Sequence, residues 1–145
     1  MLVKEGAVKL LDFGLARHGA PVGPEPRAIG ASGTISGTLS GTLLYMPPEI
    51  LRGETATSAS DVFSLGVVLY ELTTGRHPFA GDTPLDVFEA IECRPVDPLR
   101  EVRTGVPVEV DRLILEMLDR RPGGRPTARA TSEILRGTAQ KKKTG

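Results

Sequence analysis

The stretch DVFSLGVVLYELTTGRHPF, residues 61–79, decides how this chain folds. Its apolar residues recur at helical spacing and form two adjacent stripes: Val62, Leu65, Leu69 and Leu72, and Phe63, Gly66, Val67 and Tyr70. A helix that is apolar around most of its circumference is buried on most sides. We therefore expect this helix to be the centre of the core, with neighbouring elements packed around it.

The two ends of this central helix carry their own signals. Ser58 and Asp61 have the spacing of a capping box, in which side-chain oxygens accept hydrogen bonds from the unpaired amides of the first turn. Gly75 is a natural C-terminal stop, because glycine readily adopts the left-handed conformation that ends many helices. The helix is therefore expected to begin at Ser58 and to end at Gly75.

Further helices are predicted on the C-terminal side. Thr83 and Pro84 begin one and Pro107 begins the next, because proline is tolerated at the start of a helix. Their apolar inner positions are Leu85, Val87, Phe88, Ile91, Val110, Leu113, Ile114, Met117 and Leu118. Residues 127–135 are expected to form a short last helix, and residues 138–145 a disordered basic tail.

The first 41 residues have a different pattern. Leu2-Val3 and residues 8–11 are predicted to be two strands of a β-hairpin whose turn is Glu5-Gly6. Between residues 19 and 41, six glycines and three prolines exclude a regular element, so this stretch is predicted to be a long loop. Loops of this length are usually functional or disordered.

The composition excludes several classes of protein. Lysine plus arginine equals aspartate plus glutamate, 18 each, so no net charge favours nucleic acid or an anionic membrane. The apolar runs are too short to span a membrane. Cys93 is the single cysteine, so no internal disulfide can form and a reducing, cytoplasmic setting is expected. His18, His77 and Cys93 are interpreted as loop or surface residues without chemistry.

Several stretches in a fixed order resemble one family. Asp12-Phe13-Gly14 after a strand, the Gly-rich loop and GTLLYMPPE at residues 41–49 resemble the activation segment of eukaryotic-like serine/threonine protein kinases. Residues 61–79 are similar to the central helix of the kinase C-lobe, and Arg125-Pro126-Thr127 resembles the arginine motif before its last helix. The resemblance implies a protein-kinase-like (α+β) C-lobe fragment over residues 1–137, mainly α, with one N-terminal β-hairpin and a long activation loop.

The resemblance also assigns roles to individual residues. Asp12 would hold magnesium against the ATP phosphates, and a carboxylate suits such a hard cation. Gly41 begins a shelf, residues 41–46, beneath the substrate residue that follows the phosphoacceptor, and Thr42 would orient the catalytic loop. Glu49 and Arg125 would form an internal ion pair. The family's counterpart of Asp61 accepts hydrogen bonds from the backbone of the catalytic loop, which lies upstream.

Two departures and one modification site follow from the same resemblance. Pro47 stands where the family usually has alanine, which would stiffen the turn, and Phe63 stands where tryptophan is common. Family members are phosphorylated in the loop before the shelf, where this chain has Ser32, Thr34, Ser36, Thr38 and Ser40. A phosphate there could order the loop by pairing with arginine.

Other parts of the kinase machinery are not found in the 145 residues. The family's Gly-rich phosphate loop, its strand lysine and its His-Arg-Asp catalytic loop all precede Asp-Phe-Gly, so this chain offers no catalytic base. We expect a C-lobe fragment, begun at an internal methionine, of an ATP-dependent serine/threonine kinase. It would phosphorylate protein substrates only when completed by the missing N-lobe and catalytic loop, and would not bind ATP and Mg²⁺ alone. The alternatives are a catalytically dead pseudokinase remnant that acts as a protein-binding module and a nonfunctional truncated product.

Overall fold

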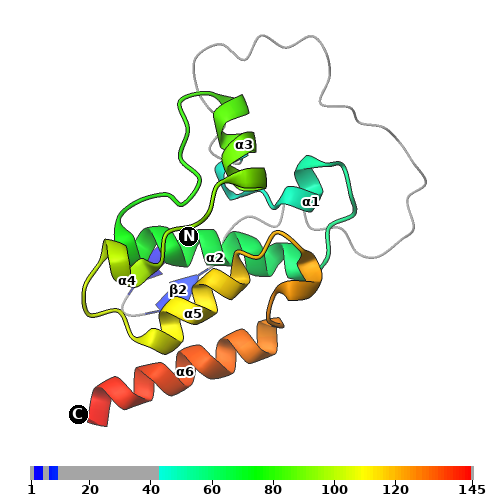
Figure 1. Cartoon of the computed structure of the whole chain (residues 1–145). Helices are drawn as coiled ribbons and strands as arrows, with labels where there is room; N and C mark the ends of the chain where they lie inside the picture. Colours follow the sequence, from blue (N-terminus) through cyan, green and yellow to red (C-terminus); the bar gives the residue numbers. More distant parts are fainter. Residues whose placement is uncertain (1, 5–6, 10–42, 145) are drawn as a thin grey trace. The chain divides into compact units, whose positions relative to one another are not determined.

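The computed structural model describes residues 2–4, 7–9 and 43–144 of the chain (Figure 1). Two short strands lie in the first part, and the second part is helical. In chain order, the elements of the second part are η1 (Leu43–Tyr45), α1 (Pro48–Leu51), α2 (Ser58–Thr74), α3 (Pro84–Cys93), α4 (Leu99–Val102), α5 (Val108–Met117), η2 (Pro122–Gly124) and α6 (Ala128–Thr144).

The N-terminal strands are three residues each. β1 (Leu2–Lys4) pairs antiparallel with β2 (Ala7–Lys9), and Val3 lies opposite Val8. This pairing does not establish the predicted hairpin as a whole, because its turn at residues 5–6 and its extension to residue 11 lie outside the described residues. The predicted loop between residues 19 and 41 lies outside them as well.

The helix α2 is the centre of the helical part. It contacts η1, α4, α5, η2 and α6, and Figure 1 shows α5 and α6 on one side of it and α1 and α3 on the other. The main buried core consists of Phe63, Val67, Tyr70, Phe79, Val87, Ala90, Ile91, Leu99, Ile114 and Leu118. A second buried cluster, Val62, Leu113 and Met117, lies between α2 and α5.

Of the two apolar stripes of α2, the one that begins at Val62 is partly exposed among the described residues. Val62 is buried, but Leu65 and Leu72 are 42% and 63% exposed. Spacing reports that a position is apolar, whereas burial also needs a neighbouring element, and within the described residues nothing covers these two leucines. An uncovered apolar face therefore runs along α2.

Both ends of α2 are capped, and the N-terminal cap differs from the prediction. Thr57, in an extended conformation, is the N-cap residue, and its Oγ1 accepts a hydrogen bond from the amide of Ala59 at 3.3 Å. Ser60 completes the capping box, because its Oγ accepts from the amide of Thr57 at 3.0 Å. The predicted box of Ser58 and Asp61 was one residue out of register. Gly75 ends the helix in the left-handed conformation, with φ of 72°, as predicted.

The next two long helices begin where they were predicted. Thr83 caps α3 in a reciprocal box with Asp86, and Pro107 directly precedes α5. On α3 the inner face is narrower than predicted, because Leu85 and Phe88 are 72% and 39% exposed. The predicted inner positions of α5 are buried, except Val110, which is half-buried.

The C-terminal end of the chain requires a correction. The last helix, α6, continues to Thr144, where a disordered tail over residues 138–145 was expected. The alanine, glutamine and lysines of this stretch are good helix formers, and Lys141 Nζ lies 3.2 Å from Glu109 Oε1 on α5. The short helix α4 was not predicted. Its fully buried Leu99 donates its amide hydrogen to Asp111 Oδ1 at 2.7 Å.

A substitution at Gly66 would test how closely α2 and α5 must approach each other. A Cβ atom at this position would lie 2.9 Å from Met117 Cβ and 3.2 Å from Leu118 Cδ2. We expect Gly66→Ala to force the helices apart and to lower the free energy of unfolding by about 1–3 kcal/mol, measured by urea denaturation. The control is Gly137→Ala in α6, where a Cβ would meet no described atom within 4 Å. That change should raise stability by about 0.5–1 kcal/mol, and equal effects of the two changes would contradict the close approach.

Candidate functional site

Residues 43–49, which we call segment 43–49, contain η1 and the start of α1 and are fixed to α2 at both ends. Pro47 is the N-cap residue of α1 and Pro48 is its first residue, a position where proline is favoured because its ring presets a helical φ. The C-terminal end of the segment is held by a buried ion pair and the N-terminal end by two hydrogen bonds from side chains. These contacts make the candidate site.

The ion pair joins Glu49 to Arg125, which lies 76 residues later. Nη1 and Nη2 of Arg125 donate to Oε1 and Oε2 of Glu49, each at 2.7 Å, so the pair is bidentate. The two residues are only 1% and 7% exposed. The pair implied by the resemblance is therefore present, and it is almost fully removed from water.

Arg125 is satisfied by more than its carboxylate partner. Its guanidinium also donates to the carbonyl oxygens of Asp119 at 2.7 Å, Ala59 at 2.9 Å and Arg120 at 3.3 Å. Its Cζ lies 4.9 Å from the ring centroid of Phe63, a cation–π arrangement. A buried charge is tolerated when it is paired and hydrogen-bonded in this way. Arg125 thus connects segment 43–49, the start of α2 and the loop before α6.

The surroundings of Glu49 keep it ionised. Burial alone would raise the pKa of this carboxyl, but the hydrogen bonds from Arg125, from the Glu49 amide and from Ser60 outweigh burial and lower the pKa to about 2. The Ser60 bond, from Oγ to Glu49 Oε1, is 2.8 Å long. Ser60 therefore serves two purposes, because the same oxygen also caps α2.

The other end of the segment is held through Tyr45. Its hydroxyl donates to Glu71 Oε2 at 2.7 Å, and its carbonyl oxygen accepts from Ser64 Oγ at 2.8 Å. The hydrogen bond to Glu71, followed by burial, raises the pKa of Tyr45. Ser64 and Glu71 are seven residues apart on α2, which places them on one face of that helix. Their spacing in the sequence indicates that Ser64 and Glu71 share a face of the helix. Nothing in the sequence indicates that Tyr45 is the common partner of the two residues.

His77 lies against the same end, in the loop between α2 and α3, which agrees with its interpretation as a loop or surface residue. It is half-buried, its Nδ1 accepts from the amide of Phe79 at 3.1 Å, and its ring meets that of Tyr45 edge to face at 5.4 Å. Burial lowers the pKa of His77. Cys93 is exposed, which agrees with the same interpretation of that residue.

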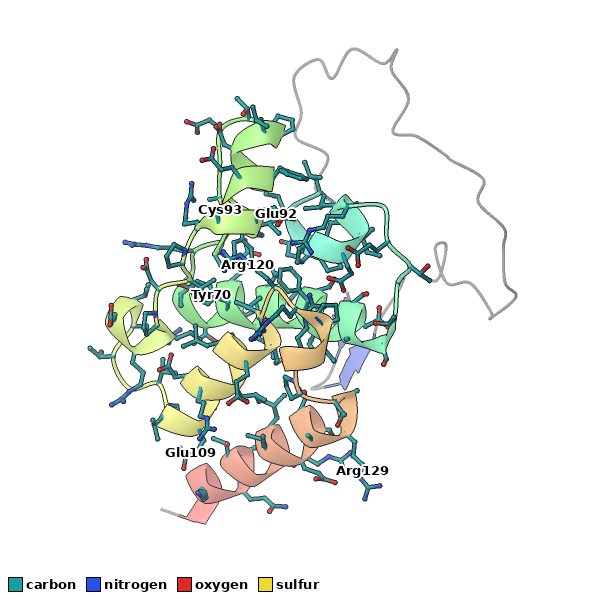
Figure 2. The ribbon with its side chains drawn as sticks, turned by 45° about the vertical axis from the view of Figure 1, so that its right-hand side comes forward. Tyr70, Glu92, Cys93, Glu109, Arg120 and Arg129 are labelled. Atoms are coloured by element: carbon teal, nitrogen blue, oxygen red, sulfur yellow. The ribbon has the colours of Figure 1, made fainter. Side chains whose placement is uncertain are left out.

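The helix α1, which continues segment 43–49, is tied to α3. Arg52 donates from Nε and Nη2 to the two carboxylate oxygens of Glu92, at 3.0 and 2.5 Å. The C-terminal end of α3 is held in turn by Arg120, whose Nε donates to the carbonyl of Ile91 at 2.8 Å and whose Nη2 donates to that of Arg94. Figure 2 labels Glu92 and Arg120, which lie near this end of α3.

Most of the other predicted site residues lie outside the described residues: Asp12, Phe13, Gly14, Ser32, Thr34, Ser36, Thr38, Ser40, Gly41 and Thr42. Asp61 lies within the described residues and is exposed, so its side chain stays in contact with water. No group of three or more described His, Cys, Asp or Glu residues is arranged to hold a metal ion. Over residues 43–144, no helix is long and apolar enough to cross a membrane.

The buried ion pair predicts an acid transition. A Glu49 pKa lowered from 4.5 to about 2 stabilises the fold fully above pH 4.5, and this contribution is lost as the pH falls towards 2. Its size is about 3 kcal/mol. At pH 7, Glu49→Gln should cost about 3–5 kcal/mol, because it leaves the Arg125 charge uncompensated. The difference in unfolding free energy between wild type and variant, from urea denaturation, should shrink as the pH falls through this window.

The matched control is Glu133→Gln on α6. Glu133 pairs with Arg129, which is labelled in Figure 2, at 3.0 Å, and both side chains are mostly exposed. Because exposed pairs contribute about 0–1 kcal/mol, this variant should unfold nearly as wild type does. Equal effects of the Glu49 and Glu133 changes at pH 7 would show that the buried pair contributes no more to stability than an exposed pair does.

Comparisons with known proteins agree with this architecture. Residues 1–135 match the protein kinase domain. The chain is 41% identical over 126 residues to the serine/threonine-protein kinase PknB of Mycolicibacterium smegmatis and 36% identical over 135 residues to the tyrosine-protein kinase MasK of Myxococcus xanthus. These alignments cover 86% and 92% of this chain but only 19% and 20% of the relatives, so the chain spans about a fifth of their length.

A solved structure gives the same answer for the fold alone. The twitchin kinase region from C. elegans superposes with a TM-score of 0.60 at 23% sequence identity, over 65% of this chain and 17% of that one. The resemblance seen in the sequence is thereby confirmed. The chain belongs to the protein kinase domain family, and serine/threonine kinases are among its relatives.

Proposed function

We propose that this chain is the C-lobe part of an ATP-dependent serine/threonine protein kinase, and that it phosphorylates protein substrates when the upstream part of a kinase domain completes it. The observation that carries the proposal is segment 43–49, which is held by the Glu49–Arg125 pair and is bound to α2 through Ser60 and Glu71. The 41% identity to a PknB kinase supports the choice of serine and threonine as acceptors.

In this proposal, segment 43–49 forms part of the shelf beneath the protein substrate. Phosphoryl transfer depends mainly on positioning and on charge stabilisation, and small displacements of a substrate are costly in rate. A shelf that is fixed at both ends to the central helix of the core would hold the residue beside the phosphoacceptor in one place. Gly41 and Thr42 would continue this shelf toward the catalytic loop.

The nucleotide and metal belong to parts of the machinery that the described residues do not contain. Asp12 would be the magnesium ligand, because a carboxylate is the kind of donor that this ion prefers. When bound, Mg²⁺ and ATP would supply the phosphoryl group and neutralise its developing charge. In this proposal the remaining ligands and the catalytic base would come from the upstream part of the kinase domain. Thr34, Ser36, Thr38 and Ser40 remain the candidate phosphorylation sites.

The uncovered face of α2 is where the upstream part would pack. Leu65 lines a groove of about 400 Å³ between α2 and α6, together with Val62 and Leu135. Asp61 stands in the same groove, exposed, where it could accept hydrogen bonds from the backbone of a catalytic loop. An apolar face of this kind marks an interaction surface in a stable fold.

The same face favours one alternative function, a catalytically dead module that binds another protein through α2. The two functions differ in their chemistry, because only the kinase requires Asp12 and Mg²⁺. They share the docking face. Catalytic activity, and not binding, therefore separates them.

The test is a chimera in which the upstream part of the PknB kinase domain from M. smegmatis precedes residue 1. We expect Mg²⁺-dependent transfer of ³²P from ATP to serine or threonine of a generic basic protein. Asp12→Asn should reduce it to background because the magnesium ligand is lost. The 145-residue chain alone should give no transfer. Activity of the chain alone would contradict the proposal, and a folded chimera no more active than its Asp12→Asn variant would favour the binding module.

Two charge substitutions test the docking face in the same chimera. Leu65→Lys with Leu72→Lys should leave the secondary structure of the chain alone unchanged, since both side chains are exposed, and should abolish transfer by the chimera. Val108→Lys on α5 is the control, because Val108 is 56% exposed and lies outside the groove. A doubly substituted chimera that is fully active would rule out this face as the docking site.

A further inference from the structure

His77 is wedged between segment 43–49 and the core. Its ring centroid lies 5.4 Å from that of Tyr45 and 6.4 Å from that of Phe79, in both cases at a steep angle. Phe79 is 1% exposed, and its ring stacks on that of Phe63 at 5.8 Å. The imidazole thus touches the segment on one side and a ring of the main core on the other.

The hydrogen bonding of His77 selects its neutral form. Nδ1 accepts from the amide of Phe79 at 3.1 Å, so the proton of a neutral ring lies on Nε2. Nε2 is buried and makes no hydrogen bond of normal geometry within the described residues, although the Leu44 backbone lies near enough to the ring to favour its charged form. An unpaired buried donor is costly, and a buried charge without a partner costs more. The geometry therefore accommodates imidazole and opposes imidazolium.

From this geometry we infer that His77 is a pH-sensitive positioning residue for segment 43–49: its neutral ring supports Tyr45, and its protonation releases Tyr45 from Glu71. The inference rests on the proposed function in one respect, which is that segment 43–49 positions a protein substrate. The switch itself would operate in the chain without ATP, metal or substrate.

The release follows from two competing contacts. A proton taken up from solvent makes Nδ1 a donor, and it then faces another donor, the amide of Phe79, so this hydrogen bond is lost. Among the described residues, Glu71 on α2 is the charged group that acts on His77, and Tyr45 on η1 is the other titratable group in contact with it. The imidazolium would be drawn to the Glu71 carboxylate, which now accepts the Tyr45 hydroxyl at 2.7 Å.

The consequence is a local loosening and not an unfolding of the segment. Tyr45 would lose its bond to Glu71, whereas the bond from Ser64 to the Tyr45 carbonyl and the Glu49–Arg125 pair would remain. Only the N-terminal end of the segment would be freed. Burial lowers the pKa of His77 below 6.5, against smaller opposite effects of Glu71 and of the Leu44 backbone. The support from the neutral ring is therefore complete above pH 6.5 and is lost as the pH falls below it.

The test is an NMR titration of the 145-residue chain between pH 8 and pH 4. The chain has two histidines and two tyrosines, so His77→Asn assigns the His77 signal and Tyr70→Phe leaves Tyr45 as the single tyrosine. We expect the His77 midpoint below 6.5 and a shift of the Tyr45 ring signals with the same midpoint. His77→Asn keeps an acceptor for the Phe79 amide but cannot titrate there, so the Tyr45 shift should disappear in that variant.

Two results would overturn the inference: a His77 midpoint equal to the ordinary 6.5, or a Tyr45 shift that persists in His77→Asn. Glu71→Gln adds a second arm, because loss of the carboxylate should lower the His77 midpoint further, and an unchanged midpoint would count against the competition for Glu71. None of these readings uses kinase activity. A failed chimera therefore leaves this result standing, and a failed titration leaves the proposed function untouched.

Discussion

The constraint on which the rest of this structure depends is the buried pair of Glu49 and Arg125. A buried ion pair is stable only when its remaining hydrogen-bonding groups also have partners. Here the partners are the Ser60 hydroxyl and the backbone carbonyls of Ala59, Asp119 and Arg120. The capped start of α2 and the loop before α6 are thus bound to the end of segment 43–49. The pair and its hydrogen bonds thus join three stretches of the chain.

The sequence was most informative where local chemistry decides the structure. Helix starts at Pro84 and after Pro107 and the stop at Gly75 follow from capping rules that operate within a few residues. Burial was predictable only in part. Leu65 has the right spacing for a core position, but spacing cannot say whether a neighbouring element is present. The length of α6 was missed because helix formers in a lysine-rich stretch were interpreted as a solvated tail.

In the candidate site too, contacts between residues far apart in the sequence could not be predicted from local chemistry. Glu49 and Arg125 were paired only through the family resemblance, since no local rule connects residues 76 positions apart. Tyr45, Glu71 and His77 were not found, because their contacts depend on how a short 3₁₀ turn lies across α2. Asp61 was named through the family resemblance, but the role implied there depends on elements that the described residues do not include.

The proposed function assigns the anchored segment to substrate positioning and the exposed apolar face of α2 to packing against the rest of a kinase domain. A double-mutant cycle on Glu49→Leu and Arg125→Met, read as free energies of unfolding at pH 7, tests most directly whether the buried pair stabilises the fold. This account predicts a coupling free energy of about 2–3 kcal/mol between the two changes. Additive effects, with a coupling within about 0.5 kcal/mol of zero, would contradict it.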